Sequence, residues 1–245
     1  MDGNRPADDF ADVRGSPGAG ARLRGFFRVI WPLAPILAGV GYLLRAAWPR
    51  PDVTTSAAGF GLLLLAGAAG VFLALSRRRL ARYWKGAVGE EMVAGELGRL
   101  PAPHVVLHGL PRGRDGVADI DHVVIGPSGV FVVETKNWSG AVTIEQGRLL
   151  CDGWSPARSP VEQVKSAAAS LKERIERSAH LNVPVHAVLV FVSPSMRGVC
   201  RGIGGVRLCG LDRLAGTLTD PSGEPLPEGW RRQIAEALEG GLPAL

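Results

Sequence analysis

Two long uncharged runs dominate the first third of the chain. The first run covers Val29–Leu44 and the second covers Val53–Leu75, and both are mostly apolar. A helix rises about 1.5 Å per residue, so about 20 apolar residues cross a hydrocarbon core of about 30 Å. The pattern predicts two transmembrane helices that form a hairpin within residues 25–80, with membrane contact through residues 29–75.

Basic residues flank the two runs unevenly. Three arginines precede the first run, and a cluster from Arg77 to Lys85 follows the second. Only Arg45 and Arg50 lie between the runs. Positively charged flanks are retained in the cytoplasm, so the sequence predicts a multi-pass protein of the cytoplasmic membrane, with both termini and the following domain in the cytoplasm. Three cysteines without a C-x-x-C pair agree with a reducing compartment.

The rest of the chain separates by pattern into a leader, a domain and an extension. Residues 1–24 are rich in Gly, Pro, Asp and Ala without apolar periodicity, which predicts a disordered leader. Residues 81–195 mix helical and strand-like periods and form the predicted domain. Residues 196–245 are predicted to pack on it as a C-terminal extension.

Within the domain, runs rich in Val and Ile alternate with amphipathic stretches. The turn Pro127-Ser128-Gly129 joins two of these runs, which predicts an antiparallel hairpin. The expected strands are 105–107, 118–125, 130–136, 142–145, 148–151 and 185–192, and the expected helices are 81–100, 160–177 and 230–238. This order predicts an α/β fold with a mixed central sheet flanked by helices.

Charged residues interrupt the most apolar of these strands at its end. Side chains alternate along a strand, so Glu134 and Lys136 point to one face. The hairpin brings Asp121 from the preceding strand near them. Asp119, two residues earlier, shares the face of Asp121 and is a second candidate ligand. Packing alone gives no reason for two carboxylates and an ammonium at this point.

Such a cluster has the groups that phosphodiester hydrolysis needs. Mg²⁺ prefers oxygen ligands and takes only one or two carboxylates from a protein, and Mn²⁺ is an alternative. The sequence therefore predicts Asp121 and Glu134 as metal ligands and Lys136 as a catalytic cation that stabilises charge on the phosphate. The five histidines show no paired-ligand spacing and are interpreted as structural or surface residues.

These motifs resemble the nuclease-related (NERD) branch of the PD-(D/E)xK nuclease superfamily over roughly residues 85–192. The resemblance rests on Asp121, on Gly86-Ala87-Val88-Gly89-Glu90 and on Glu134-Thr135-Lys136-Asn137-Trp138-Ser139-Gly140. It implies a restriction-endonuclease-like core. It also implies catalytic roles for Glu90, with Glu91 as the alternative, and for Gln163 on the following helix. Ile120 stands where the superfamily's name has Pro, which is often absent.

The resemblance implies a metal-dependent endonuclease-like protein that acts on DNA or RNA at the cytoplasmic side of a membrane. The net charge of +5 is compatible with a polyanionic partner, although much of it lies beside the apolar runs. One alternative is a catalytically silent module that binds nucleic acid or protein. Another is a structural membrane protein that functions through its hairpin. The sequence leaves the oligomeric state open.

Overall fold

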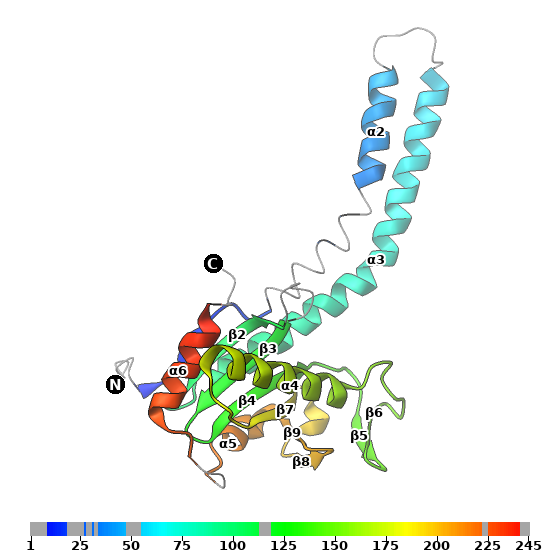
Figure 1. Ribbon diagram of the computed structural model, residues 1–245. Coiled ribbons are helices and arrows are strands. Elements are labelled where there is room, and N and C mark those ends of the chain that lie inside the picture. The colour runs from blue at the N-terminus through cyan, green and yellow to red at the C-terminus, as the bar shows by residue number, and fades with distance from the viewer. Residues whose placement is uncertain are drawn as a thin grey trace, which may run out of the picture. The chain divides into compact units, whose positions relative to one another are not determined.

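The fold consists of two compact units. A computed structural model of the chain describes residues 9–18, 27, 31, 34–47, 55–112, 119–221 and 225–240 (Figure 1). One unit comprises Met1–Gly20 and Gly86–Leu245, and the other comprises Ala21–Lys85. The larger unit contains a central sheet with helices on both faces, and it carries all the residues predicted to form the site.

The central sheet has seven strands and is mixed. Its order is β1 (Asp12–Arg14), β2 (Val105–Pro111), β3 (Asp119–Gly126), β4 (Gly129–Lys136), β7 (Val185–Phe191), β9 (Val206–Gly210) and β8 (Cys200–Ile203). Strand β3 is antiparallel to both of its neighbours, whereas β4, β7 and β9 are parallel to one another. A separate hairpin pairs β5 (Val142–Glu145) with β6 (Arg148–Cys151).

Helices cover both faces of this sheet. On one face lie α4 (Pro160–Ala179) and α6 (Glu228–Glu239), whose apolar side chains share a core with alternate residues of β3, β4 and β7. The end of α3 (Thr55–Leu97), together with α5 (Leu214–Leu218), packs on the other face (Figure 1). Short 3-10 turns span Pro194–Met196 and Leu211–Arg213. The predicted α/β fold with a mixed sheet flanked by helices is confirmed.

Local sequence explains the elements beside the site. Gly129, at φ +128°, closes the β3–β4 turn opposite Gly126. Ser159 caps α4 by accepting a hydrogen bond from the Glu162 amide, and Pro160 takes the first helical position. The helix ends at His180, which adopts the left-handed conformation. These signals place Gln163 in the first turn of α4.

Two segments outside the predicted domain belong to the sheet. Asp12–Arg14, which the sequence assigned to a disordered leader, form β1 and pair in parallel with β2. Residues 1–8 and 19–24 of that leader lie outside the described residues. The C-terminal extension contributes β9, which pairs with β7, and β8 at the edge of the sheet. Both segments are short or polar, so neither shows a clear strand period.

The structure contradicts the predicted membrane location. Helix α2 (Ala34–Ala47) has 14 residues, or about 21 Å, which is less than the core of a bilayer. Helix α3 continues past Leu75 through the basic cluster to Leu97. Among the described residues, no helix is both long and apolar enough to cross a membrane. The predicted placement in the cytoplasmic membrane, through residues 29–75 and with cytoplasmic termini, is therefore wrong. Residues 29–30, 32–33 and 48–54 lie outside the described part.

Candidate active site

Strands β3 and β4 separate at the predicted site. Their ladder ends at the pair His122↔Val133, one residue before Asp121 would face Glu134. The regular alternation of β3 also breaks here, because Ile120 and Val123 both pack in the core beneath α4. On β2, Gly109 opposite this point has φ +64°, which glycine adopts without strain. The backbone thus opens a gap between the two central strands.

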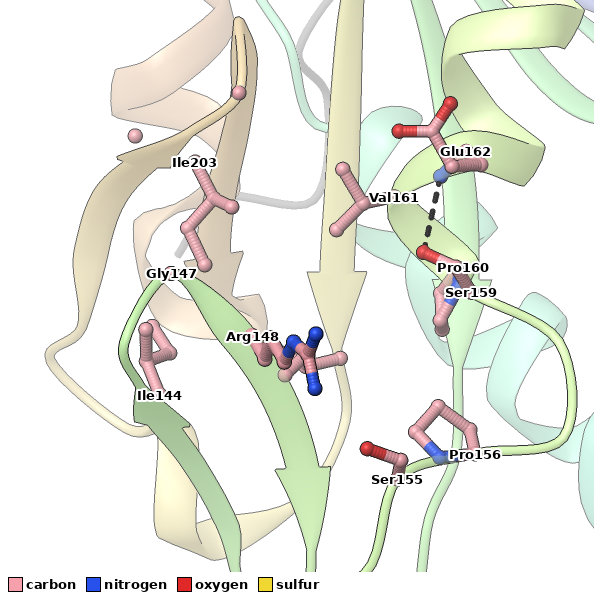
Figure 2. Close-up of a pocket in the computed structure, with 13 residues that line it drawn as sticks. Ile144, Gly147, Arg148, Ser155, Pro156, Ser159, Pro160, Val161, Glu162 and Ile203 are labelled. Carbon is pink, nitrogen blue, oxygen red and sulfur yellow. Dashed lines mark hydrogen bonds between the residues drawn. The ribbon is translucent and has the colours of Figure 1, made fainter.

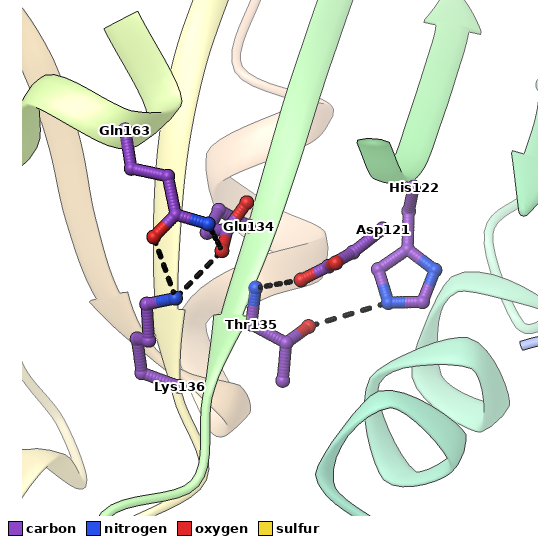
Figure 3. Close-up of polar contacts among 6 residues, drawn as sticks. All are labelled: Asp121, His122, Glu134, Thr135, Lys136 and Gln163. Atoms are coloured by element: carbon purple, nitrogen blue, oxygen red, sulfur yellow. Dashed lines mark hydrogen bonds and ion pairs between the residues drawn. The ribbon is translucent and has the colours of Figure 1, made fainter. Parts of the chain in front are cut away.

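The side chain of Asp121 fills that gap. Its Oδ2 accepts a hydrogen bond from the backbone N–H of Thr135 at 2.8 Å, in place of a backbone acceptor from β3 (Figure 3). The carboxylate is thereby fixed beside the end of β4 by a main-chain donor. A rigid backbone donor orients a carboxylate more firmly than a long side chain could, because it has no rotamers to lose.

Glu134, Lys136 and Gln163 form a closed triangle beneath α4. Lys136 Nζ donates to Glu134 Oε1 at 2.6 Å and to Gln163 Oε1 at 3.2 Å. Gln163 Nε2 donates to the same Glu134 oxygen at 2.5 Å (Figure 3). The side chain of Glu134 is only 5% exposed and that of Lys136 is 18% exposed. The predicted ligand, cation and amide are thus in direct contact, held by three hydrogen bonds.

Negative charge converges on Asp121. Burial, followed by the charges of Glu134 and Glu90, raises the pKa of its carboxyl well above the usual range. The Thr135 amide and the ammonium of Lys136 oppose this shift without cancelling it. Such a concentration of like charges is unfavourable in the protein alone, and a cation bound among the carboxylates would relieve it.

Helix α3 approaches the end of β4 closely enough for the charge of Glu90 to act on Asp121. A Cβ on Gly89 would lie 2.6 Å from Cβ of Asn137, just after β4, so only glycine permits the contact. The next residue, Glu90, is partly buried, and its charge acts on Asp121. Its neighbour Glu91 is exposed. Of the two predicted alternatives, the structure therefore brings Glu90 to the cluster.

A second polar network lies on the α3 side of β4. His108 and His122 face each other through their Nδ1 atoms at 2.7 Å, and His122 Nε2 lies 3.2 Å from the Thr135 hydroxyl. Burial lowers the pKa of His108 to about 4 and that of His122 well below its usual value. Sequence reasoning assigned these histidines no place beside the site. The only sequence signal for this network was that His122 directly follows Asp121. His108 lies opposite His122 on β2, which the sequence did not indicate.

The carboxylates of Asp121 and Glu134 supply the oxygen ligands that a hard divalent cation prefers. Within the described part of the chain, Oδ1 of Asp121 and Oε2 of Glu134 take part in no hydrogen bond. Among the described residues, no group of three or more His, Cys, Asp or Glu side chains is arranged to hold a metal. Two carboxylates are nevertheless enough for Mg²⁺, which keeps most of its water. Asp119 is the first residue of β3, two residues before Asp121, and is paired with Pro111.

A cavity of about 590 Å³ opens beside the first turn of α4. Its walls come from the β5–β6 hairpin, the start of α4 and the β8–β9 turn (Figure 2). The lining is mostly apolar, and Arg148 of β6 lies between the hairpin and the helix. Glu162, next to Gln163 in the chain, forms part of the rim. The cavity thus adjoins the element that supplies Gln163.

Comparison with known proteins supports the resemblance over the same residues. Residues 85–192 match the family described as Nuclease-related domain. An uncharacterized protein of Bacillus anthracis is 45% identical over 60 residues, which are 23% of this chain and 28% of that protein. The chain therefore spans less than a third of the length of that relative. No solved structure matches the chain. The chain carries a nuclease-related domain at residues 85–192.

Proposed function

We propose that the domain is a metal-dependent nuclease of the PD-(D/E)xK type, which hydrolyses phosphodiester bonds in DNA or RNA. The observation that carries the proposal is the contact triangle of Glu134, Lys136 and Gln163 next to the carboxylate of Asp121. A module that only bound nucleic acid would need Arg and Lys at the phosphates and would have no use for converging carboxylates.

Asp121 and Glu134 are the proposed ligands of Mg²⁺ or Mn²⁺. Each has one oxygen fixed by hydrogen bonds and one oxygen left for a cation. The bound cation would supply a water of lowered pKa and offset negative charge on the phosphate. Glu90 adds a third negative charge close to Asp121 and is proposed to hold water at the site.

Lys136 is the proposed catalytic cation. Its ammonium is held between Glu134 and Gln163. The side chain remains partly exposed, so the ammonium can contact a phosphate oxygen of a bound substrate. An ammonium aimed at a phosphate gains most when charge develops in the transition state. Gln163 positions both partners, because its amide group donates to Glu134 and accepts from Lys136.

The cavity beside α4 is the proposed path for the nucleic acid next to the cleaved bond. Its apolar walls suit a base, and Arg148 supplies a cation for a backbone phosphate. Among the described residues, Arg148 has no ion pair. Its guanidinium is therefore available to a ligand.

The experiment is a cleavage assay on the full chain with single- and double-stranded DNA and RNA. Each substrate is incubated with Mg²⁺, with Mn²⁺ or with a chelator. We expect cleavage that requires the metal and that Lys136→Ala abolishes. Lys172→Ala serves as the matched control, since Lys172 lies on the exposed side of α4 and pairs with Glu176 at 3.7 Å. Cleavage should be unchanged in that variant.

Two outcomes would contradict the proposal. Cleavage that persists in chelator would exclude the metal, and equal cleavage by Lys136→Ala and Lys172→Ala would exclude the triangle as the catalytic centre. Metal-independent binding of nucleic acid with no cleavage of any substrate would instead identify a silent binding module.

A further inference from the structure

A second cavity, of about 450 Å³, lies at the edge of the sheet away from the proposed active site. It is lined by residues of β8, β9 and α5 and of the loops that flank α5, namely Cys200, Arg201, Gly202, Arg207, Arg213, Gly216, Thr217 and Asp220. Three of these residues are arginines and one is an exposed cysteine. The proposed mechanism of phosphodiester hydrolysis uses neither this thiol nor these guanidinium groups.

Cys200 has a second cysteine directly opposite it. In the antiparallel pair of β8 and β9, Cys200 is the register partner of Cys209. The neighbouring pair is joined by a hydrogen bond from the Gly210 amide to the Val199 carbonyl, so Cys200 and Cys209 form a non-hydrogen-bonded pair. Side chains are closest at such pairs, where the Cα atoms lie about 4.5 Å apart, within the span of a disulfide.

Both thiols point toward one hydroxyl group of α5. Cys200 Sγ lies 3.8 Å from Oγ1 of Thr217, and Thr217 also hydrogen-bonds to Cys209. Cys209 is fully buried, and this burial raises the pKa of its thiol to about 12. One sulfur is therefore open to a reagent in the cavity, while the other is shielded from solvent but adjacent to the first.

The cavity is electropositive. Within the described chain, Arg201 makes no hydrogen bond or ion pair, and Arg207 donates to the Thr217 carbonyl at 3.2 Å. Arg213 lies 3.9 Å from Asp212, and both side chains are largely exposed, so this pair is weak. Asp220 is the one acid in the lining. A small anion that carries several carboxylates fits this excess of positive charge.

We propose that Cys200 and Cys209 are a redox-active pair that exchanges with an anionic low-molecular-weight disulfide bound at the arginines. The Cys200 thiolate attacks one sulfur of the reagent, forms a mixed disulfide and releases one reagent thiol. Cys209 then loses its proton and attacks Sγ of Cys200, which releases the second reagent thiol. Two protein thiols are oxidised to one disulfide, and one reagent disulfide is reduced to two thiols.

This site is independent of the proposed nuclease centre but shares one element with it. The end of β8 and the turn after it, through Gly202, Ile203 and Gly204, also line the cavity beside α4. A Cys200–Cys209 disulfide joins the two strands that this turn connects. The pair therefore lies on the two strands whose connecting turn forms a wall of the proposed substrate path.

The test uses the full chain, oxidised glutathione as the anionic reagent and 2-hydroxyethyl disulfide as the neutral one, with intact-mass spectrometry and peptide mapping. We expect one glutathione to attach first at Cys200 and then to leave as a Cys200–Cys209 disulfide forms. The first adduct should accumulate, because the buried Cys209 thiol resists deprotonation. Attachment only at Cys151, or no disulfide between Cys200 and Cys209, would overturn the proposal.

Variants separate the two steps and the anion site. Cys209→Ser, or Cys209→Ala if the first folds poorly, should trap the mixed disulfide at Cys200, while Cys151→Ser should behave as the wild type. The double variant Arg201→Ala/Arg213→Ala should react about tenfold more slowly with oxidised glutathione and at the wild-type rate with the neutral reagent. Equal slowing with both reagents, or none with either, would overturn the role of the arginines.

Discussion

The two sides of the end of β4 carry polar networks of opposite character. On the α4 side, Glu134, Lys136 and Gln163 form a charged network with an ammonium that is partly open to solvent. On the α3 side, His108, His122 and Thr135 form a buried network in which both rings are neutral at physiological pH. Asp121 lies between the two networks.

This difference indicates that the charged network takes part in catalysis and that the buried network stabilises the fold. A charged network at the edge of the core keeps part of its hydration and remains within reach of a substrate. A buried neutral network cannot meet a substrate, but it satisfies polar atoms in the core and fixes the strand that carries Asp121. Substitutions on the α4 side should therefore change catalysis, and those on the α3 side should change stability.

The largest effect is expected at Lys136. Lys136→Ala removes the proposed transition-state cation, so cleavage should fall by at least about 100-fold while affinity for Mg²⁺ changes little. His108→Gln on the other side should lower cleavage by less than about tenfold after correction for the folded fraction. Single-turnover cleavage and metal titration measure both quantities. Comparable losses of cleavage in Lys136→Ala and His108→Gln would show that the two networks do not differ in their role in catalysis.

The next effect is a loss of stability in acid. His108 has a folded-state pKa of about 4, below the ordinary value of 6.5, so the unfolded chain binds more protons between these values. The contribution of His108 to the free energy of unfolding is fully present above pH 6.5 and should fall by about 3 kcal/mol as the pH approaches 4.

Urea unfolding of the full chain across this pH range measures the loss. His108→Gln should show a shallower pH dependence of the free energy of unfolding than the wild type. A wild-type slope in His108→Gln would show that the histidine pair does not control acid stability.

A smaller effect is expected for Gln163. Gln163→Ala leaves Glu134 and Lys136 in place but removes the amide that orients both, so metal affinity should weaken about tenfold. Cleavage at saturating metal should fall less than in Lys136→Ala. If Gln163→Ala abolished cleavage even at saturating metal, the amide would belong to the reacting groups rather than to their support.

The sequence predicted the strands of the site well because their patterns are local. Val and Ile runs with a Pro-Ser-Gly turn marked β3 and β4, and Ser159-Pro160 marked the start of α4. The alternation that put Glu134 and Lys136 on one face was sufficient to predict their contact. The nuclease-related domain was predicted over the residues that match its family.

What the sequence missed depends on contacts between distant segments. β1 becomes a strand only by pairing with β2, about 90 residues later, and β9 only by pairing with β7. The place of His108 beside His122 follows from the β2–β3 register, which no local pattern specifies. The membrane prediction failed on helix length and apolar character: among the residues that the structure describes, neither α2 nor α3 is both long and apolar enough to cross a membrane.

The central claim is that Asp121 and Glu134 converge to hold a cation, and urea unfolding of the full chain tests it without a substrate. The raised pKa of Asp121 means that its ionised form disfavours folding above the ordinary aspartate pKa. At neutral pH in chelator, Asp121→Asn should therefore be more stable than the wild type by about 0.5–2 kcal/mol, and this gain should vanish below about pH 3.9. Mg²⁺ should stabilise the wild type and Asp119→Asn, and should stabilise Asp121→Asn much less. An Asp121→Asn protein that is less stable in chelator and responds fully to Mg²⁺ would contradict the account.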